Sequence, residues 1–277
     1  MDLLLIEWRL WLLSNTSHDK EIERKRYDQR AAVSMISLNS CNDAILGANA
    51  LQSWLRSPYI AYELEIQKML SSFHIALEIG AGTGQFSSSL LRWADRVIAT
   101  DISSKSLDLL QLRYPKAKNL ETRVCDMESL DFMENTFDLV ASAGSLSYGD
   151  SDLVMNEIYR VLKPGGYFIC VDSLNHNPIY RLNRAINCLR GRRTASTLKR
   201  MPTFALIDSY RKLFGRVEIQ YFGAFSWLSP LMASFIGEAK TAEWSDTIDR
   251  RLKVKMSAFK FVMVVKKPGC EVAELMV

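Results

Sequence analysis

From His74 onward, short apolar runs alternate with amphipathic stretches, a pattern typical of strand-helix units that feed a parallel sheet. The apolar runs predict seven strands, near Ile75–Ile79, Val97–Thr100, Glu121–Cys125, Phe137–Ser142, Tyr167–Val171, Val217–Phe222 and Phe259–Val265. Apolar positions at helical spacing predict helices over Phe86–Trp93, Lys105–Arg113 and Leu153–Leu162, the last one stopped by Pro164 and the glycines that follow it. The sequence therefore predicts an α/β fold with a doubly wound, seven-stranded, mostly parallel sheet.

Two further helices are expected ahead of this core. Residues His18 to Met35 carry charges of both signs and predict an exposed helix. A second helix is expected from about Pro58 to Phe73, because apolar positions recur at helical spacing after a proline. We therefore divide the chain into N-terminal helices, residues 1–73, and a core domain, residues 74–277.

A mostly helical insertion is expected after the fifth strand, over about residues 174–214. Between Ser173 and Ile207 there is no acidic residue, and the basic residues are Arg181, Arg184, Arg190, Arg192, Arg193, Lys199 and Arg200. Such a block produces a positive field that attracts phosphate or carboxylate groups. A solvated surface without a ligand is the alternative, and the sequence leaves both open.

The composition is that of an ordinary folded protein: of 277 residues, 48% are hydrophobic, and the formal net charge is +4. The five cysteines form no CxxC pair, so we expect no disulfide framework, no metal site and a cytoplasmic location. The chain starts with an apolar run, MDLLLIEWRLWLLS, which is too short to span a bilayer and lacks the basic start of an export signal. Three roles stay open for this run: packing on the domain, contact within a homodimer, and contact with a membrane surface.

The strongest local motif is ALEIGAGTGQF, in which a strand ends near Glu78 and the glycines Gly80, Gly82 and Gly84 precede a helix. Such glycines permit a tight turn without side chains between backbone and ligand, at the sheet edge where doubly wound folds bind ligands. The spacing departs from the dinucleotide pattern GxGxxG, because the third glycine comes one residue early and Gln85 takes its usual place. Glu78 would repel a pyrophosphate but attract a cationic amino group.

Side chains suited to a nucleoside follow the next strands. Asp101, in VIATDIS, stands where a carboxylate accepts hydrogen bonds from both ribose hydroxyls. In VCDME, Asp126 is suited to accept from an adenine amino group and Met127 to contact the ring. After the fourth strand, the small residues 141–144 leave room for a ligand. Each carboxylate alone could be a helix cap, but four such positions at four successive strand ends favour one shared ligand.

These elements, in this order and spacing, resemble the class I S-adenosylmethionine-dependent methyltransferases over roughly Ala76 to Asp172. The resemblance implies their Rossmann-like fold, with S-adenosylmethionine as the cofactor. It assigns the cofactor contacts to Glu78, Gly80, Ala81, Gly82, Gly84, Asp101, Ile102, Asp126, Met127 and Ala143. The segments Lys25–Ala31 and Ser57–Tyr59 also look like the lid helices that close over the cofactor in many small-molecule members.

Methyl transfer from a sulfonium requires an acceptor atom in line with the methyl group and the exclusion of water. An oxygen acceptor must also lose its proton. Among the three histidines, His176 is the one expected near the carboxyl edge of the sheet, so it is the first candidate for the general base. It could instead order the loop that follows. Tyr148 and Asp172 are the other catalytic candidates, with Asp150 in reserve.

We expect O-methylation of a small, anionic acceptor, such as a sugar or a glycan-linked molecule, bound by Tyr59, Arg181 and Arg184. A nucleic-acid substrate is the first alternative; the net charge of only +4 and the lack of an NPPY-like motif after the fourth strand argue against it. A nicotinamide-dependent oxidoreductase is the second, and Glu78 and Gln85 argue against that. A non-catalytic partner that keeps the fold is the third.

Overall fold

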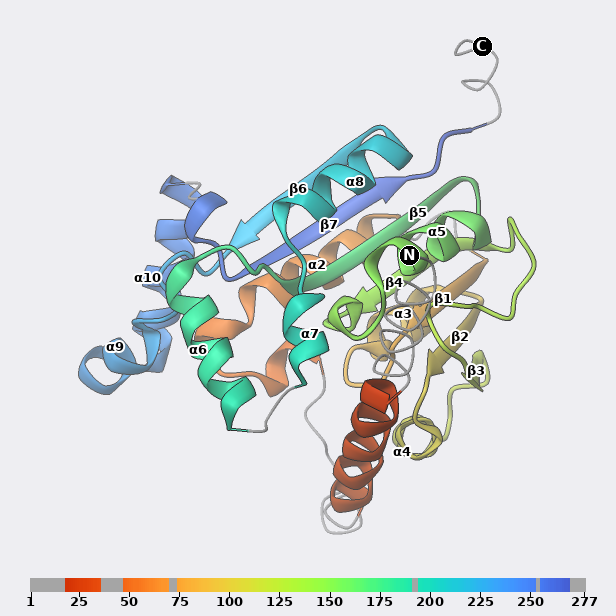
Figure 1. Cartoon of the computed structure of the whole chain (residues 1–277), viewed down its shortest axis with the longest axis horizontal. Helices are drawn as coiled ribbons and strands as arrows, with labels where there is room; N and C mark the ends of the chain where they lie inside the picture. Colours follow the sequence, from red (N-terminus) through yellow and green to blue (C-terminus); the bar gives the residue numbers. More distant parts are fainter. Residues whose placement is uncertain (1–17, 36–46, 70–73, 191–193, 253–254, 270–277) are drawn as a thin grey trace, which may run out of the picture.

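The computed structural model describes residues 18–35, 47–69, 74–190, 194–252 and 255–269. Its centre is a seven-stranded sheet in the order β3-β2-β1-β4-β5-β7-β6 (Figure 1). The strands are β1 (Ile75–Ile79), β2 (Arg96–Asp101), β3 (Leu120–Val124), β4 (Phe137–Ala143), β5 (Leu162–Ser173), β6 (Val217–Phe222) and β7 (Lys260–Lys266). Strand β7 pairs antiparallel with both of its neighbours, β5 and β6, and the other neighbouring strands of the sheet pair parallel. The predicted doubly wound, mostly parallel sheet is therefore confirmed.

Helices cover both faces of the sheet (Figure 1). The helices are α2 (Ser57–Met69), α3 (Ser87–Trp93), α4 (Ser104–Arg113), α5 (Ser151–Val161), α6 (Pro178–Leu189), α7 (Ala195–Lys199), α8 (Phe204–Phe214), α9 (Ser229–Ile236) and α10 (Glu238–Leu252). Residues 18–35 are helical as well. Helices α2, α3 and α4 pack on one face, and α5 and α8 on the other.

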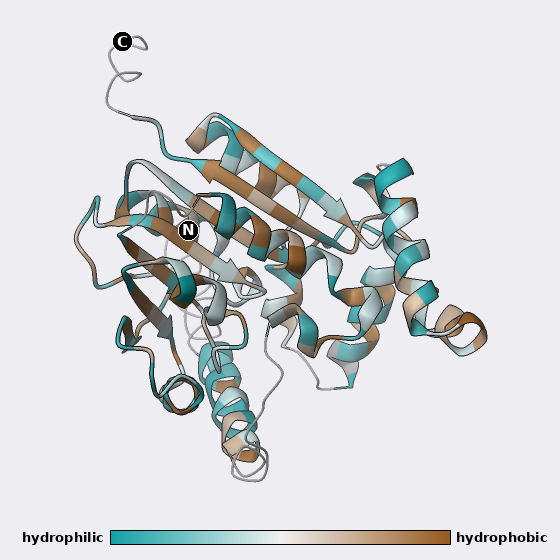
Figure 2. Cartoon of the chain, turned by 180° about the vertical axis from the view of Figure 1, so that it is seen from behind, coloured by the Kyte–Doolittle hydropathy of each residue, from teal (hydrophilic) through white to brown (hydrophobic). Residues whose placement is uncertain are grey.

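Strand β7 shows why this sheet has two buried faces. Phe261, Met263 and Val265 belong to the core cluster under α5 and α8. Val262 and Val264, which alternate with them, belong to the cluster under α2 and α3. Because side chains of a strand point alternately to the two faces, a sheet covered on both sides requires a continuous apolar run. Figure 2 shows this as brown strands between helices of mixed colour.

Two parts of the fold differ from the prediction. Strand β5 starts at Leu162, five residues before the expected Tyr167, because Leu162 already pairs with Phe137 and the segment around Pro164 forms an irregularity inside the strand. Helices α9 and α10, between β6 and β7, were not predicted. The sequence of α9, SPLMASFI, is apolar on almost every side and therefore has no helical period of apolar and polar positions.

Helices α6, α7 and α8 follow β5, where the helical insertion was expected. Helix α2 ends at Met69, and the expected continuation to Phe73 lies outside the described residues. The apolar run at the start of the chain, with its three alternative roles, also lies outside them. None of the described helices is long and apolar enough to cross a membrane. The division of the chain at residue 73 stays a prediction.

Candidate functional site

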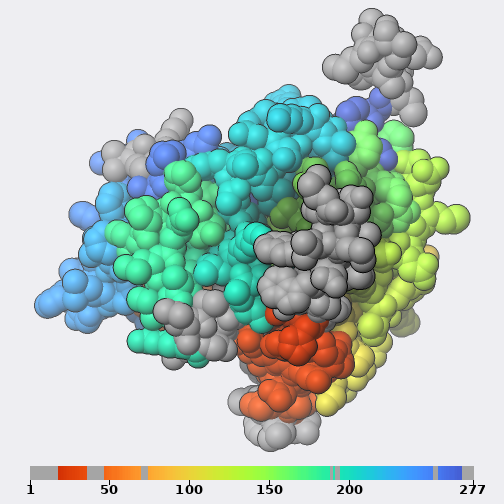
Figure 3. Space-filling model, in the orientation of Figure 1, coloured from red at the N-terminus to blue at the C-terminus, as the bar shows by residue number. Residues whose placement is uncertain are grey.

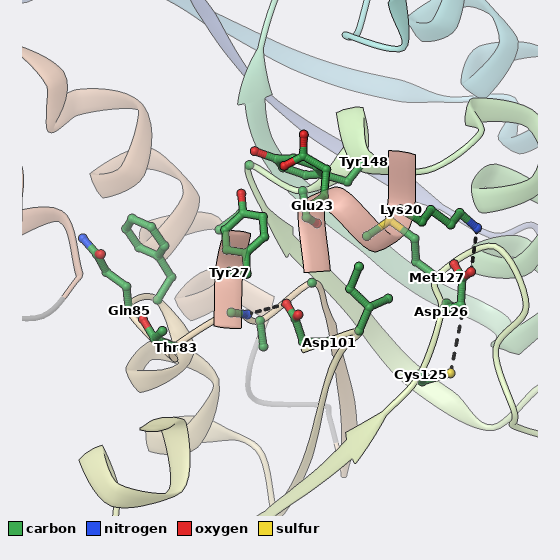
Figure 4. A pocket seen from close by; sticks show the side chains of 18 residues that line it. Lys20, Glu23, Tyr27, Thr83, Gln85, Asp101, Cys125, Asp126, Met127 and Tyr148 are labelled. Atoms are coloured by element: carbon green, nitrogen blue, oxygen red, sulfur yellow. Dashed lines mark hydrogen bonds and ion pairs between the residues drawn. The ribbon is translucent and has the colours of Figure 1, made fainter. Parts of the chain in front are cut away.

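A cavity of about 220 Å³ lies at the carboxyl ends of β1, β2, β3 and β4 (Figure 4). Most of the predicted cofactor contacts line it: Gly80, Ala81, Gly82, Asp101, Ile102, Asp126, Met127 and Ala143. The carboxyl ends of neighbouring parallel strands meet at one edge, and the loops that leave them open a crevice there. Residues that are up to 63 positions apart in the sequence thus form one wall, as the spacing of the motifs predicted.

Gly80 and Gly84 fold the turn after β1 for different reasons. Both have positive φ angles, of 61° and 77°, which favour glycine. At Gly80, a Cβ atom would lie 2.3 Å from the Cβ atom of Ser145, in the loop after β4. At Gly84, it would lie 2.6 Å from Cγ of Leu110 in α4, and Gly84 is not part of the cavity wall. One glycine therefore lets two loops meet beside the cavity, and the other lets a helix pack behind it.

Asp101 connects the end of β2 to the glycine turn. Its two carboxylate oxygens accept hydrogen bonds from the backbone N–H of Gly82 and of Ser103, each at 2.9 Å. Figure 4 shows the first of these bonds as a dashed line. Burial raises the pKa of Asp101, and these two hydrogen bonds offset only part of that effect. A carboxylate has about four acceptor sites, so Asp101 can still accept from ligand hydroxyls on its cavity side.

Glu78 lies behind the cavity wall and not on it. Its side chain is buried, and its Oε2 atom accepts a hydrogen bond of 2.6 Å from the hydroxyl of Ser87, the first residue of α3. Burial raises the pKa of Glu78 to about 7; the hydrogen bond from Ser87 lowers it, and the nearby Asp101 raises it further. The site therefore holds the buried carboxyl group of Glu78 and the half-buried one of Asp101, a composition that disfavours a pyrophosphate.

The helix of residues 18–35 covers the cavity, and Lys20, Glu23 and Tyr27 form part of the wall (Figure 4). The Lys20 ammonium donates hydrogen bonds of 2.6 Å to both Asp126 and Glu128, in the loop after β3. Partial burial lowers the pKa of Lys20, but the two carboxylates outweigh this and raise it. The pair at Asp126 occupies the carboxylate that the sequence assigned to the adenine amino group.

The same helix has two further attachments. The buried Glu23 accepts hydrogen bonds from the hydroxyls of Thr194, at 3.0 Å, and Thr197, at 3.3 Å, at the start of α7. The ring of Tyr27 packs edge-on against Tyr148, with 5.5 Å between the ring centres. The segment Lys25–Ala31, which resembled a lid over the cofactor, contains Tyr27, but we named none of Lys20, Glu23 and Tyr27 as residues that line the cavity. Their spacing of three and four residues puts them on one helix face, which is the sequence signal that could have found them.

Of the catalytic candidates, Tyr148 lies on the cavity wall. His176 does not: its ring packs on Phe204, with 4.5 Å between the ring centres. The role of His176 as a general base stays a prediction, and its contact with Phe204 fits the alternative that it orders a loop.

The two remaining carboxylate candidates hold backbone. Asp172 is buried, and its oxygens accept from the backbone N–H of Leu146, at 3.0 Å, and of Ser173, at 2.6 Å. Asp150 caps α5 by accepting from the first backbone N–H groups of that helix. Asp172 thereby fixes the loop that carries Tyr148, and its catalytic role stays a prediction.

The three predicted acceptor contacts do not meet in one place. Tyr59 stacks on Phe86, with 4.5 Å between the ring centres, and Phe86 lines the cavity. Arg184 is buried and donates to the backbone oxygen of Leu174 at 2.8 Å. Arg181 is exposed on α6. Tyr59 thus lies one ring behind the cavity, whereas the two arginines lie outside its wall.

Comparison with known proteins identifies the core of the chain. Residues 77–170 match the family model described as a methyltransferase domain. Over 100 residues the chain is 34% identical to the ubiquinone/menaquinone biosynthesis C-methyltransferase UbiE of Desulfotalea psychrophila. This match covers 35% of this chain and 40% of the relative. Over 102 residues the chain is 37% identical to the mitochondrial arginine-hydroxylase NDUFAF5 of Danio rerio. This match covers 35% of this chain and 30% of the relative. The chain thus spans less than half the length of these two relatives.

A solved structure with the same fold is geranyl diphosphate C-methyltransferase from Streptomyces coelicolor, in complex with S-adenosylhomocysteine. The TM-score is 0.54 at 16% sequence identity, over 77% of each chain. At 16% identity, the similarity to this structure concerns the fold alone. Neither a nucleic-acid enzyme nor a nicotinamide-dependent enzyme is among these relatives.

The buried Glu78 should make stability depend on pH. Its pKa is about 7 in the native state against 4.5 in the unfolded chain, so between these values the native state holds a proton that the unfolded state has released. The free energy of unfolding should therefore fall from about pH 5 to 7, by about 1.4 kcal/mol per unit from this group. Glu78→Gln should remove that slope in urea unfolding, whereas Glu134→Gln, at an exposed position, should keep it. Equal slopes in all three proteins would contradict this assignment.

The Lys20 ion pairs should hold the covering helix in place. Lys20→Ala removes two hydrogen bonds to carboxylates, each worth about 1.5–3 kcal/mol when formed, less for partly exposed groups. We expect amide hydrogen exchange in residues 18–35 to become about tenfold faster. Lys25→Ala is the matched control, because Lys25 lies on the same helix and, among the described residues, forms an ion pair only with the half-exposed Glu21, at 3.4 Å. Unchanged exchange in Lys20→Ala would show that other contacts hold the helix.

Proposed function

We propose that this chain, whose core has the fold and the domain signature of the class I methyltransferases, transfers a methyl group from S-adenosylmethionine to a small-molecule acceptor. One observation carries this proposal. A bare glycine turn, the Asp101 carboxylate, the Asp126–Met127 pair and small residues around Ala143, each at the end of a different strand, line a single cavity.

The wall of the cavity fits an adenosyl group. Asp101 has acceptor sites left for ribose hydroxyls, and Ile102 and Met127 offer apolar contacts for a purine. Asp126 would bind the adenine amino group only beside or in place of Lys20, so the backbone of the loop after β3 is a further source of base contacts. A dinucleotide fits less well, because its phosphates would lie close to the carboxyl groups of the buried Glu78 and the half-buried Asp101.

The chain's own residues bind, orient and exclude water in this proposal. When bound, the cofactor supplies an electrophilic methyl group on a sulfonium. The covering helix closes the cavity through Lys20, Glu23 and Tyr27, which removes water from the reacting atoms. Tyr148 lies on the cavity wall in the loop after β4, and its hydroxyl would orient an acceptor by a hydrogen bond.

The proposed acceptor is small and anionic. Support comes from Arg200, directly after α7: one of its guanidinium nitrogens lies 3.9 Å from Glu128, which also pairs with Lys20 of the cavity wall. The names of two proteins reported above point to lipophilic acceptors, a quinone precursor and geranyl diphosphate, and to methylation of carbon. The sugar O-methylation expected from the sequence gains no support from these names. One of the relatives reported above is named an arginine-hydroxylase, so similarity to this group of proteins does not by itself establish methyl transfer, and turnover has to be measured directly.

Cofactor binding tests the proposal through Asp101. Asp101→Asn removes the charge that strengthens hydrogen bonds to ligand hydroxyls, so the dissociation constant of S-adenosylhomocysteine should rise by about tenfold or more. Calorimetric titration measures it. Asp108→Asn, at an exposed position in the neighbouring helix α4, should leave the constant unchanged. If both variants bind as the parent protein does, Asp101 does not hold the cofactor.

Turnover distinguishes the acceptor-side candidates. Release of S-adenosylhomocysteine is measured with a demethylated quinone and with geranyl diphosphate, and then with variants on the acceptor that reacts. Tyr148→Phe should lower kcat/KM by about tenfold, because one hydrogen bond at the cavity wall is lost. His176→Ala should change kcat/KM less than threefold, because His176 lies outside the cavity wall and packs on Phe204. The reverse order of effects would restore His176 as the general base.

A further inference from the structure

One end of the molecule exposes large apolar side chains together. Six of them define what we call the apolar end: Ile179, Leu182, Trp227, Leu231, Phe235 and Ile236. They come from α6, from α9 and from the segment between β6 and α9. Figure 3 shows α6 in green and α9 in blue at the same end of the molecule. Scattered single apolar residues are normal on a protein surface, but a contiguous group marks an interaction site.

Helix α9 has the reverse of the usual burial pattern. Its one buried residue is Ser229, whereas the side chains of Leu231 and Phe235 are 58% and 81% exposed. It packs mainly on α10, and its other sides face away from the core (Figure 2). An apolar helix that exposes its apolar residues is not explained by the packing of the described residues.

Helix α6 is joined to this region by Tyr180. The Tyr180 hydroxyl donates a hydrogen bond of 2.9 Å to the backbone oxygen of Gly223 and accepts one of 3.0 Å from the backbone N–H of Trp227. The exposed Ile179 and Leu182, three residues apart, lie on another face of α6, away from the side on which Tyr180 holds the segment that leads into α9. Arg181, between them, is exposed as well. Helix α6 thus exposes both apolar and cationic side chains at this end of the molecule.

Exposed cations accompany these apolar side chains. Within residues 178–190 and 229–251, which contain α6, α9 and α10, the exposed basic residues are Arg181, Arg190, Lys240, Arg250 and Arg251, and the exposed acidic residues are Glu238 and Glu243. The other two carboxylates of α10 are engaged internally: Asp246 with the Ser57 hydroxyl, and Asp249 with the backbone of Gly223 and Ala224. The described residues of these helices therefore expose more positive than negative charge.

We propose that the apolar end docks on an anionic phospholipid surface. Exposed leucine, isoleucine and phenylalanine side chains enter the interface of a bilayer, tryptophans lie at its polar boundary, and arginines and lysines contact anionic headgroups. A second copy of the chain is disfavoured because it would bring two net positive surfaces together. A nucleic acid would satisfy the cations but leave the aliphatic side chains exposed.

This docking surface shares no residue with the cavity wall and does not depend on methyl transfer. It would, however, let an enzyme for an amphiphilic acceptor work where that acceptor is dissolved. Failure of the docking proposal and failure of the methyl-transfer proposal are separable, because vesicle binding is measured without cofactor or acceptor.

The test is co-sedimentation of the full chain with vesicles. We expect binding to vesicles of phosphatidylglycerol mixed with phosphatidylcholine, weaker binding to phosphatidylcholine alone, and loss of binding at high salt. Phe235→Ser should weaken binding by about tenfold, since it removes an exposed aromatic side chain that would become buried in the lipid interface. Arg181→Glu should weaken binding to the anionic vesicles specifically. Met133→Ser is the matched control, because Met133 is 82% exposed but lies far from α9, in the loop before β4.

Each outcome decides the proposal. Binding that is lost in Phe235→Ser and kept in Met133→Ser, with unchanged thermal stability in both, supports it. No binding of the parent protein to anionic vesicles overturns it. Equal binding of parent and Phe235→Ser also overturns it, since the lipid contact then lies elsewhere in the chain. Self-association that Phe235→Ser abolishes, without vesicle binding, overturns it in favour of contact between copies.

Discussion

The hydrogen bond from the Gly82 backbone to the Asp101 carboxylate is the contact on which the site depends. It ties the turn after β1 to the end of β2, and the same carboxylate holds Ser103 at the start of α4. The carboxylate is kept beside the cavity although burial raises its pKa. The fold therefore positions the Asp101 carboxylate before a ligand binds. This lowers the entropic cost of binding, because fewer groups of the protein have to be ordered.

The covering helix depends on this edge of the sheet for its place. Lys20 is anchored to the loop after β3, and the Asp28 carboxylate accepts a hydrogen bond of 2.6 Å from the Ser103 hydroxyl after β2. Glu23 joins the same helix to α7, in the insertion after β5. Three loops at the carboxyl edge therefore determine where the helix lies, so that closure of the cavity and geometry of the cavity are coupled. Such closure contributes to catalysis by excluding water from the reacting atoms.

The sheet and most of the cavity wall could be predicted because both follow from local patterns. Apolar runs marked most of the strands, although not β3, whose sequence is LETRV. The glycine turn and Asp101 fall at strand ends, where topology brings them together. What failed depends on contacts between distant segments. Nothing in the local sequence pairs Lys20 with Asp126 or sends Arg184 inward to the Leu174 carbonyl. Helix α9 escaped prediction because its apolar residues do not alternate with polar ones.

The account rests on one claim: strand-end carboxylates and a bare glycine turn form a site for an adenosyl-sulfonium molecule and not for a dinucleotide. Calorimetric titration of the unaltered chain with S-adenosylhomocysteine and, separately, with NAD tests it most directly. The account predicts saturable one-to-one binding of S-adenosylhomocysteine and no heat of binding with NAD. A folded protein that binds NAD, or that binds neither compound, would contradict it.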